Sequence, residues 1–175
     1  MDTFAAGALA SLSPNWNVMK DRPRKSGVNG DFIITKSMAR SIFVVGALFV
    51  AVQIALLLWM SGENGLTPYR QSEFFTFFVM LQFWNMFNAR SYATGRSFLQ
   101  LKHGKGFMAI VGVIVLGQII IVELLYNFFN VEPMFHTEDW RFNCDGFVDW
   151  ITIVGATSLV LWVREAWSAL RRRVR

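Results

Sequence analysis

The two longest apolar runs in the sequence lie at residues 38–60 and 107–129. Each run contains one charged side chain, Arg40 near the start of the first and Glu123 within the second. A bilayer core about 30 Å thick is crossed by roughly 20 helical residues. Because the backbone has to satisfy its own hydrogen bonds in lipid, such runs form helices. The pattern therefore predicts two membrane-spanning helices.

Two shorter apolar runs follow the same pattern less clearly. One extends from Phe74 to Asn88, and the other from Phe147 to Val163 with Asp149 near its start. Runs of this length also occur in buried helices of soluble proteins, so hydropathy alone leaves the first of them undecided. The distribution of charge along the chain decides between the two interpretations.

Basic residues gather in three segments, and only Arg70 and Arg141 of the 17 lie elsewhere. Cytoplasmic loops of membrane proteins are enriched in Lys and Arg, and the three segments share one side only if both shorter runs also span. We therefore predict an all-α integral membrane protein with its basic carboxy-terminal tail in the cytoplasm. Its four complete spans lie at 38–60, 74–89, 107–129 and 147–163. The three basic segments are Lys20–Arg40, Arg90–Lys105 and Arg164–Arg175.

An Ala-rich apolar segment precedes the first full span. From Asp2 to Leu12 a helix extends roughly 16 Å, about half a membrane, and Pro14 disfavours its continuation. A helix that begins with a carboxylate at mid-membrane is expected to be the second half of a longer one. We therefore add an amino-terminal half-helix, residues 1–12, to the four complete spans.

Acidic residues gather on the opposite side, between the third and fourth spans. The segment from Asn130 to Asp149 carries five carboxylates, predicted to face the periplasm or the external medium. They are interpreted as a solvated loop, or alternatively as a vestibule that attracts cations. The five are Glu132, Glu138, Asp139, Asp145 and Asp149.

Polar side chains are few within the apolar runs, and polar groups in lipid usually face other helices or a wet pathway. For Gln53 and Gln118 we expect hydrogen bonds between helices, and for Glu123 a structural role. Gln82 and Asn85 are three residues apart and share a helix face. Their amide oxygens are hard ligands suited to Ca²⁺, so this pair is a candidate ion-binding feature.

Catalytic motifs are absent from the sequence. The Gly104-Lys105 pair has Leu99 where a phosphate-binding loop needs glycine, and no loop is long enough to fold a nucleotide domain. His103 and His136 are predicted on opposite sides of the membrane, so they cannot share a metal. Cys144, the single cysteine, cannot form an intramolecular disulfide. We expect no catalysis, no cofactor and no nucleic-acid partner for this chain alone.

Two motifs, in the right order, resemble a known family of pumps. Residues 1–6, Met-Asp-Thr-Phe-Ala-Ala, followed by Leu-Ala-Ser at 9–11 and a proline, resemble the sixth transmembrane helix of P-type calcium ATPases of the plasma-membrane type. Residues 77–90, Phe-Phe-Val-Met-Leu-Gln-Phe-Trp-Asn-Met-Phe-Asn-Ala-Arg, are similar to the eighth helix. The resemblance implies that residues 1–175 are helices six to ten of such a pump.

The resemblance also assigns candidate ion-site residues. Asp2 matches the sixth-helix aspartate that ligates the transported ion, and Gln82 matches an eighth-helix position that is glutamate in two-site pumps. Asn85 is expected to be a packing residue, or to contact the ion's ligands without binding the ion itself. Met86 stands in place of an acidic residue, and residues 12–14 replace a Glu-Pro-Pro; these departures predict a bacterial version in the inner (plasma) membrane.

The family's phosphorylation, nucleotide and actuator domains have no counterpart in this sequence. The leading hypothesis is therefore the carboxy-terminal fragment of a cation pump, inactive alone, whose partners are the bilayer and the remainder of the ATPase. Ca²⁺ as transported ion, with ATP and Mg²⁺, would act only in the parent pump. Alternatives are a freestanding four-helix scaffold or partner subunit of a transporter, and a small channel that uses Gln118 and Glu123.

Overall fold

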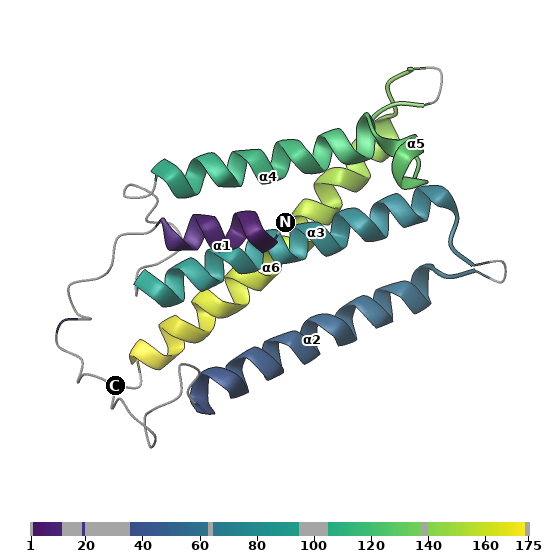
Figure 1. Ribbon diagram of the computed structural model, residues 1–175. Helices are drawn as coiled ribbons and strands as arrows, with labels where there is room; N and C mark the ends of the chain where they lie inside the picture. The colour runs from purple at the N-terminus through teal and green to yellow at the C-terminus, as the bar shows by residue number, and fades with distance from the viewer. Residues whose placement is uncertain are drawn as a thin grey trace, which may run out of the picture. The chain divides into compact units, whose positions relative to one another are not determined.

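The computed structural model describes residues 2–11, 19, 36–62, 65–94, 105–137 and 140–173. This part of the chain is all-helical and contains no β-strand (Figure 1). The basic residues at 20–25 and 96–102, His103 and the side chains of Asp2 and of the tail from residue 167 lie outside the description. The helices are α1 (Asp2–Ala10), α2 (Lys36–Met60), α3 (Pro68–Thr94), α4 (Lys105–Glu123), α5 (Tyr126–Phe129) and α6 (Cys144–Arg173).

The helix α2 belongs to a separate unit, residues 14–65, and is described by itself. Its side chains are apolar all round and mostly exposed, including Phe43, Leu48 and Leu58. A helix that is hydrophobic on every face is typical of a membrane span. Since α2 is described alone, the hydrogen bond expected of Gln53 stays a prediction.

Three of the described helices are long and apolar enough to cross a membrane. These segments are Met38–Met60, Lys105–Glu123 and Cys144–Val163, which correspond to the first, third and fourth predicted spans. The second predicted span, 74–89, lies inside α3, which continues without a break from Pro68 to Thr94. The polar residues near both ends of α3 lower its hydropathy, and it is not among the three candidates.

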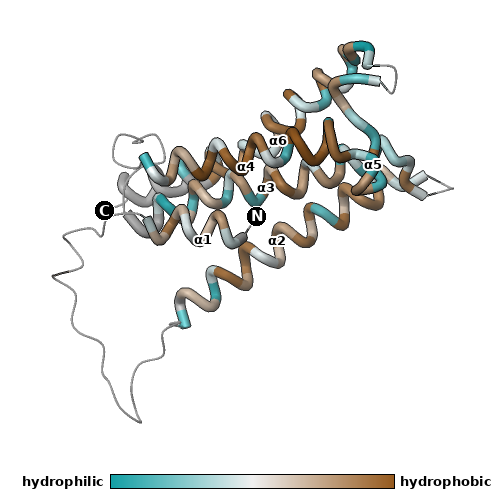
Figure 2. Tube along the Cα trace, turned by 45° about the horizontal axis from the view of Figure 1, so that its top comes forward, coloured by the Kyte–Doolittle hydropathy of each residue, from teal (hydrophilic) through white to brown (hydrophobic). Residues whose placement is uncertain are grey.

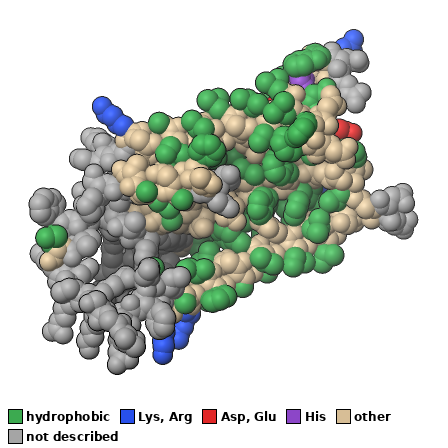
Figure 3. Space-filling view, viewed as in Figure 1, with side chains coloured by type: hydrophobic (Ala, Val, Ile, Leu, Met, Phe, Trp, Pro, Cys, Tyr) green, Lys and Arg blue, Asp and Glu red, His purple; other side chains and the backbone are tan. Residues whose placement is uncertain are grey.

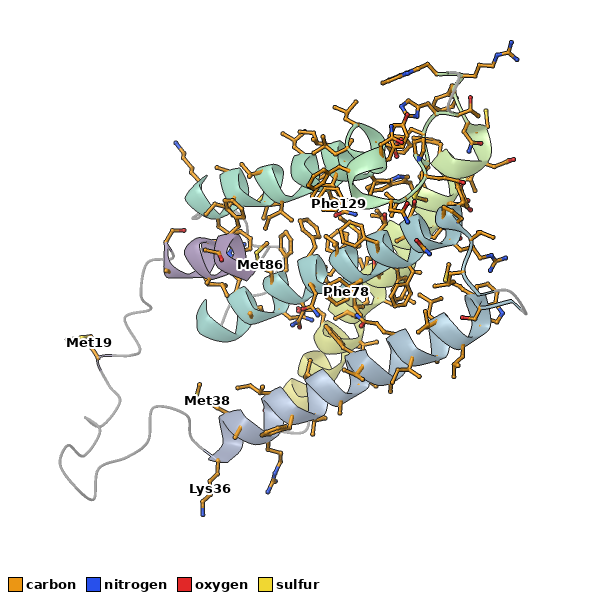
Figure 4. The ribbon with its side chains drawn as sticks, turned by 45° about the vertical axis from the view of Figure 1, so that its right-hand side comes forward. Met19, Lys36, Met38, Phe78, Met86 and Phe129 are labelled. Carbon is orange, nitrogen blue, oxygen red and sulfur yellow. The ribbon has the colours of Figure 1, made fainter. Side chains whose placement is uncertain are left out.

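The second unit combines residues 1–13 with 66–175 and contains the buried core. In it α3 packs along α6, and α1 lies against α4 and α3 (Figure 1). Phe87 of α3 meets Phe107 of α4 edge to face, with ring centroids 5.3 Å apart. In Figure 4, Met86 belongs to this core, whereas Phe78 lies on the exposed side of α3. The core consists of Ala8, Val79, Met80, Phe83, Met86, Phe87, Phe107, Val111, Ile114, Val122, Met134, Trp150, Ile153 and Leu161.

Hydrogen bonds from side chains of α3 fix its register against α6. Trp84 Nε1 donates to Thr157 Oγ1 at 3.1 Å, and Asn88 Nδ2 donates to the carbonyl of Val160 at 3.3 Å. Because polar groups in an apolar layer are costly without partners, each pair favours one alignment of the two helices. Trp84 and Asn88 both belong to the motif that resembles the eighth pump helix.

The apolar run at 107–129 does not form one straight helix. The helix α4 ends at Glu123, where the amides of Leu124 and Leu125 both bond to the carbonyl of Ile120. After this turn the short α5 follows, and it ends at Asn130 in the left-handed conformation, with φ of 54°. The helix thus ends before the predicted 107–129 does, at Glu123, whose carboxylate bonds to a later loop as described below. Figure 2 shows the apolar stretch of α4 ending near α5.

Candidate functional site

A pocket of about 640 Å³ lies between α1, α3 and α4. The helix α1 contributes Phe4, two residues after Asp2, and α3 contributes Gln82. The remaining wall is almost entirely apolar, and among the described residues the lining does not include Asn85. The lining residues are Phe4, Phe75, Phe78, Val79, Gln82, Val113, Ile114, Gly117, Gln118 and Ile121.

The helix α1 borders this pocket through its first turn. Its nine residues extend about 14 Å, less than half of a membrane core. The end of α1 packs closely against α4. Ala8 is fully buried, and a Cβ added at Gly106 of α4 would lie 3.4 Å from Ser11 Oγ. At the first turn of α1, Phe4 is exposed and lines the pocket together with residues of α3 and α4.

Gln118 provides the helix-to-helix hydrogen bond that the sequence predicts. It is 3% exposed, and its Nε2 donates to Thr76 Oγ1 of α3 at 3.4 Å. The hydroxyl of Thr76 in turn lies 3.9 Å from Met134 Sδ, toward which it donates. The prediction for Gln118 is therefore confirmed, and its amide nitrogen holds α4 to α3.

Gln82 is half-buried and faces the pocket from α3. With Gln118 it supplies two side-chain amides to an otherwise apolar space. A Ca²⁺ ion takes six to eight oxygen ligands, so two amide oxygens fall well short of a complete site. Across the described residues, no three His, Cys, Asp or Glu side chains come together as a metal site. The arrangement can contribute ligands to a site but cannot form one without further groups.

Glu123 is the second polar centre, at the other end of α4. It is 5% exposed and accepts three hydrogen bonds: from the amide of Met134 at 3.2 Å, from the amide of Phe135 at 2.9 Å and from Trp150 Nε1 at 3.2 Å. One buried carboxylate thus joins α4, α6 and the 131–143 loop. The structural role predicted for Glu123 is confirmed, although its three partners are not readable from the apolar run that contains it.

The same loop is also attached to α3. The hydroxyl of Ser72, which is fully buried, donates to the carbonyl of Glu132 at 2.5 Å and accepts from the amide of Glu132 at 3.0 Å. Together with Glu123, this contact holds the start of the loop against two helices. The loop's carboxylates at positions 138 and 139 lie outside the described residues.

The acidic groups at this end of the bundle are partly buried against one another. Tyr69 donates its hydroxyl to Asp149 Oδ2 at 2.7 Å, and burial together with this carboxylate raises the pKa of Tyr69 above its usual range. Burial and then the charge of Asp149 raise the pKa of Glu73, while Arg70 partly offsets the shift. Because Asp149 is bonded to Tyr69, its role here is to connect α3 with α6.

At the opposite end of the bundle, a cation lies against an aromatic ring. Arg90 is 6% exposed, and its guanidinium carbon is 4.9 Å from the centroid of the Phe107 ring. Arg90 is the last residue of the motif of residues 77–90. Its contact with Phe107 connects the last part of α3 to the start of α4. Figure 3 shows hydrophobic side chains over the middle of the helices and charged ones near their ends, as the interfaces of a bilayer favour.

A family model and individual relatives among known proteins agree with one another. A family model described as cation transporting ATPase, C-terminus, matches residues 1–170. Calcium-transporting ATPase 7, plasma membrane-type, of Oryza sativa subsp. japonica is 32% identical over 135 residues, which cover 77% of this chain and 13% of the relative. Calcium-transporting ATPase 9, plasma membrane-type, of Arabidopsis thaliana is 34% identical over 136 residues, which cover 73% of this chain and 12% of the relative.

A third relative matches a longer part of the chain. Calcium-transporting ATPase 2, plasma membrane-type, of Arabidopsis thaliana is 30% identical over 153 residues, which cover 82% of this chain and 14% of the relative. The chain therefore spans about one eighth of the length of these curated relatives. All three are plant proteins, so they do not support the bacterial origin that the sequence departures predict.

Proposed function

The chain belongs to the C-terminal family of cation-transporting ATPases, and on that premise we propose that it forms the last membrane helices of an ATP-driven P-type pump for Ca²⁺. Phosphorylation and nucleotide binding are assigned to the parts of the parent pump that this sequence does not contain. In this proposal the chain supplies packing support and part of the ion site, and is inactive alone.

The proposed membrane topology has four complete spans and the half-helix α1. The helix α3 is continuous through 74–89 and packs along α6, which itself contains a candidate span. A helix packed lengthwise on a spanning helix has nearly the same depth in the bilayer. With α3 as a span, the basic segments share the cytoplasmic side and the 131–143 loop lies outside.

The observation that carries the ion-site proposal is the pocket beside the first turn of α1. Phe4, two residues after the proposed ligand Asp2, lines the same space as the proposed ligand Gln82, which supports the proposal that both contribute to one site. Both are oxygen donors of the kind that Ca²⁺ prefers, and the absent helices of the pump would provide the remaining ligands.

The test is a split pump. The chain is expressed in membrane vesicles together with a related calcium pump that lacks its own carboxy-terminal helices, and ATP-driven uptake of ⁴⁵Ca²⁺ is measured. Uptake is expected only when both parts are present, and Asp2→Asn is expected to abolish it. Gln82→Ala is expected to raise the Ca²⁺ concentration for half-maximal uptake by about tenfold. Gln53→Ala, a glutamine of the apolar helix α2 that the ion-site proposal does not include, is the matched control.

The contrary results are equally specific. Full uptake with Asp2→Asn and Gln82→Ala would remove both residues from the ion site while leaving the packing role. Failure of the two parts to associate, with the chain alone stable in the membrane, would favour the alternative of a freestanding scaffold or partner subunit. The buried core shared by α1, α3, α4 and α6 is the observation that favours this alternative.

The channel alternative receives less support. Both of its pathway residues, Gln118 and Glu123, are buried and engaged in hydrogen bonds within the protein. A residue that serves as a packing contact is poorly placed to exchange ligands with a passing ion. The bacterial plasma membrane stays a prediction from the departures at Met86 and at residues 12–14.

A further inference from the structure

His136 lies in the 131–143 loop with both ring nitrogens buried. Its side chain is 12% exposed, and within the described part of the chain neither Nδ1 nor Nε2 has a hydrogen-bond partner. A neutral imidazole carries one N–H donor and one acceptor nitrogen, and both lose water on burial. A buried polar group without partners costs free energy, so a donor or acceptor that approached either nitrogen would stabilise this arrangement.

The nearest charged group is the carboxylate of Glu123. The distance from His136 Nδ1 to Glu123 Oε2 is 4.0 Å, which is too long for a hydrogen bond but short enough for an ion pair. A carboxylate has about four sites for donors. Oε1 accepts from Met134 and Trp150, whereas Oε2 accepts only the amide of Phe135 among the described donors. The open site is therefore on the oxygen that faces His136.

The other neighbours of the imidazole are aromatic. Trp140 lies edge to face with a ring-centroid distance of 4.2 Å, and Tyr126 of α5 is 6.1 Å away. The backbone of His136 pairs with Phe142, beside the exposed Arg141. On α6, Asp145 is exposed and Asp149 is bonded to Tyr69. Glu123 is thus the one carboxylate that the structure places against His136 within the described residues.

We propose that His136 and Glu123 form a proton-operated latch between the 131–143 loop and the end of α4. Histidine changes its charge between about pH 5 and 8. When His136 is protonated, Nδ1–H donates to Glu123 Oε2 and fills the fourth site of the carboxylate, which holds the loop on α4 and α6. When His136 is neutral, Nδ1 can still donate in one tautomer, but the attraction between opposite charges is lost and the loop opens more readily.

This inference rests on the proposed topology in one respect: with the loop outside, the latch responds to the pH of the external medium. An acidic exterior then holds the 131–143 loop on Glu123, and an alkaline exterior loosens it. The chemistry of the latch itself depends only on His136, Glu123 and the two loop amides that Glu123 binds.

Hydrogen exchange of the amides of Met134 and Phe135 tests the latch. The full chain is placed in lipid nanodiscs, and exchange is followed from pH 8 to pH 5.5 with correction for the intrinsic rate. We expect their protection to rise by about tenfold as pH falls, since one charge-assisted hydrogen bond is gained. His136→Phe keeps a ring against Trp140 but cannot titrate, and Glu123→Gln keeps the shape but removes the charge. Both variants are expected to give less than a twofold change.

Controls and contrary outcomes are built into the same measurement. Backbone amides in the middle of α3 report on the fold as a whole and should not follow the pH dependence. If His136→Phe does not fold, His136→Gln provides a second neutral side chain. A flat profile in the wild type, or the same rise in the His136 variants, refutes the latch and leaves the pump assignment untouched. Failure of the split-pump assay in turn leaves the latch intact.

Discussion

Among the glycines of the described residues, Gly146 in the first turn of α6 is the one where an added methyl group should do the most damage. A Cβ atom at Gly146 would lie 1.8 Å from the carbonyl oxygen of Met134, 2.7 Å from its carbonyl carbon and 3.0 Å from Asn143 Nδ2. The first two atoms are backbone and cannot rotate away. We therefore expect Gly146→Ala to force the 131–143 loop off the helix.

The size of the effect follows from the peptide that has to move. Raising the contact from 1.8 to at least 3.0 Å requires a shift of about 1.2 Å. The Met134 carbonyl and the Phe135 amide belong to one planar peptide unit, so the 2.9 Å hydrogen bond from Phe135 to Glu123 is lost with the shift. A hydrogen bond to a charged group contributes about 1.5–3 kcal/mol, and overpacking costs about 1–3 kcal/mol. Together they predict a destabilisation of about 3–5 kcal/mol.

The assay is unfolding of the purified chain by SDS in mixed micelles, followed by tryptophan fluorescence and by exchange at the Phe135 amide. Gly155→Ala is the matched control, because it changes the same residue type in the same helix and a Cβ there meets nothing within 4 Å. The control is expected to be neutral or slightly stabilising, since alanine is the better helix former. A Gly146→Ala variant within about 0.5 kcal/mol of the control, with the Phe135 amide still protected, would refute the reasoning.

Three further predictions concern the contacts of α3 and the topology. Burial and a neighbouring carboxylate raise the pKa of Glu73, so its contribution to stability is present below the ordinary Glu pKa and is lost as pH rises through the raised value. In SDS unfolding, Glu73→Gln should therefore become more stable relative to the wild type as the pH is raised from 4 to 7. A stability difference that stays constant with pH would contradict this. Trp84→Phe removes the hydrogen-bond donor to Thr157 and should lower the free energy of unfolding by about 1 kcal/mol. A double-mutant cycle with Thr157→Val should give a coupling energy of about 0.6 kcal/mol. Zero coupling would show that the bond is not stabilising. Cys144 is exposed and should react with a membrane-impermeant maleimide on intact cells. A cysteine introduced by Ala89→Cys in a Cys144→Ser background should react only after the cells are permeabilised. The reverse pattern would invert the proposed topology.

The candidate ion site could be predicted from the sequence only in part. The motif of residues 77–90 singled out Gln82 and Asn85 because they share a helix face, but the pocket is lined by Gln82 and not by Asn85. Whether a polar side chain on that face reaches open space depends on where α1 ends and on the tilt of α4, which spacing along one helix does not contain. The side chain of Asp2 lies outside the described residues, so its role stays a prediction.

Hydropathy and charge along the chain determined the class of protein and its helices, because the fit of an apolar run to a bilayer is a local property. The runs at 38–60, 107–129 and 147–163 were identifiable in this way, and so was the family, through two short motifs. The tertiary structure alone decided that α4 ends at Glu123, and that Glu123 and Gln118 find their partners on other elements. A buried polar group takes whichever partner the packing brings to it, and that partner can lie anywhere in the sequence.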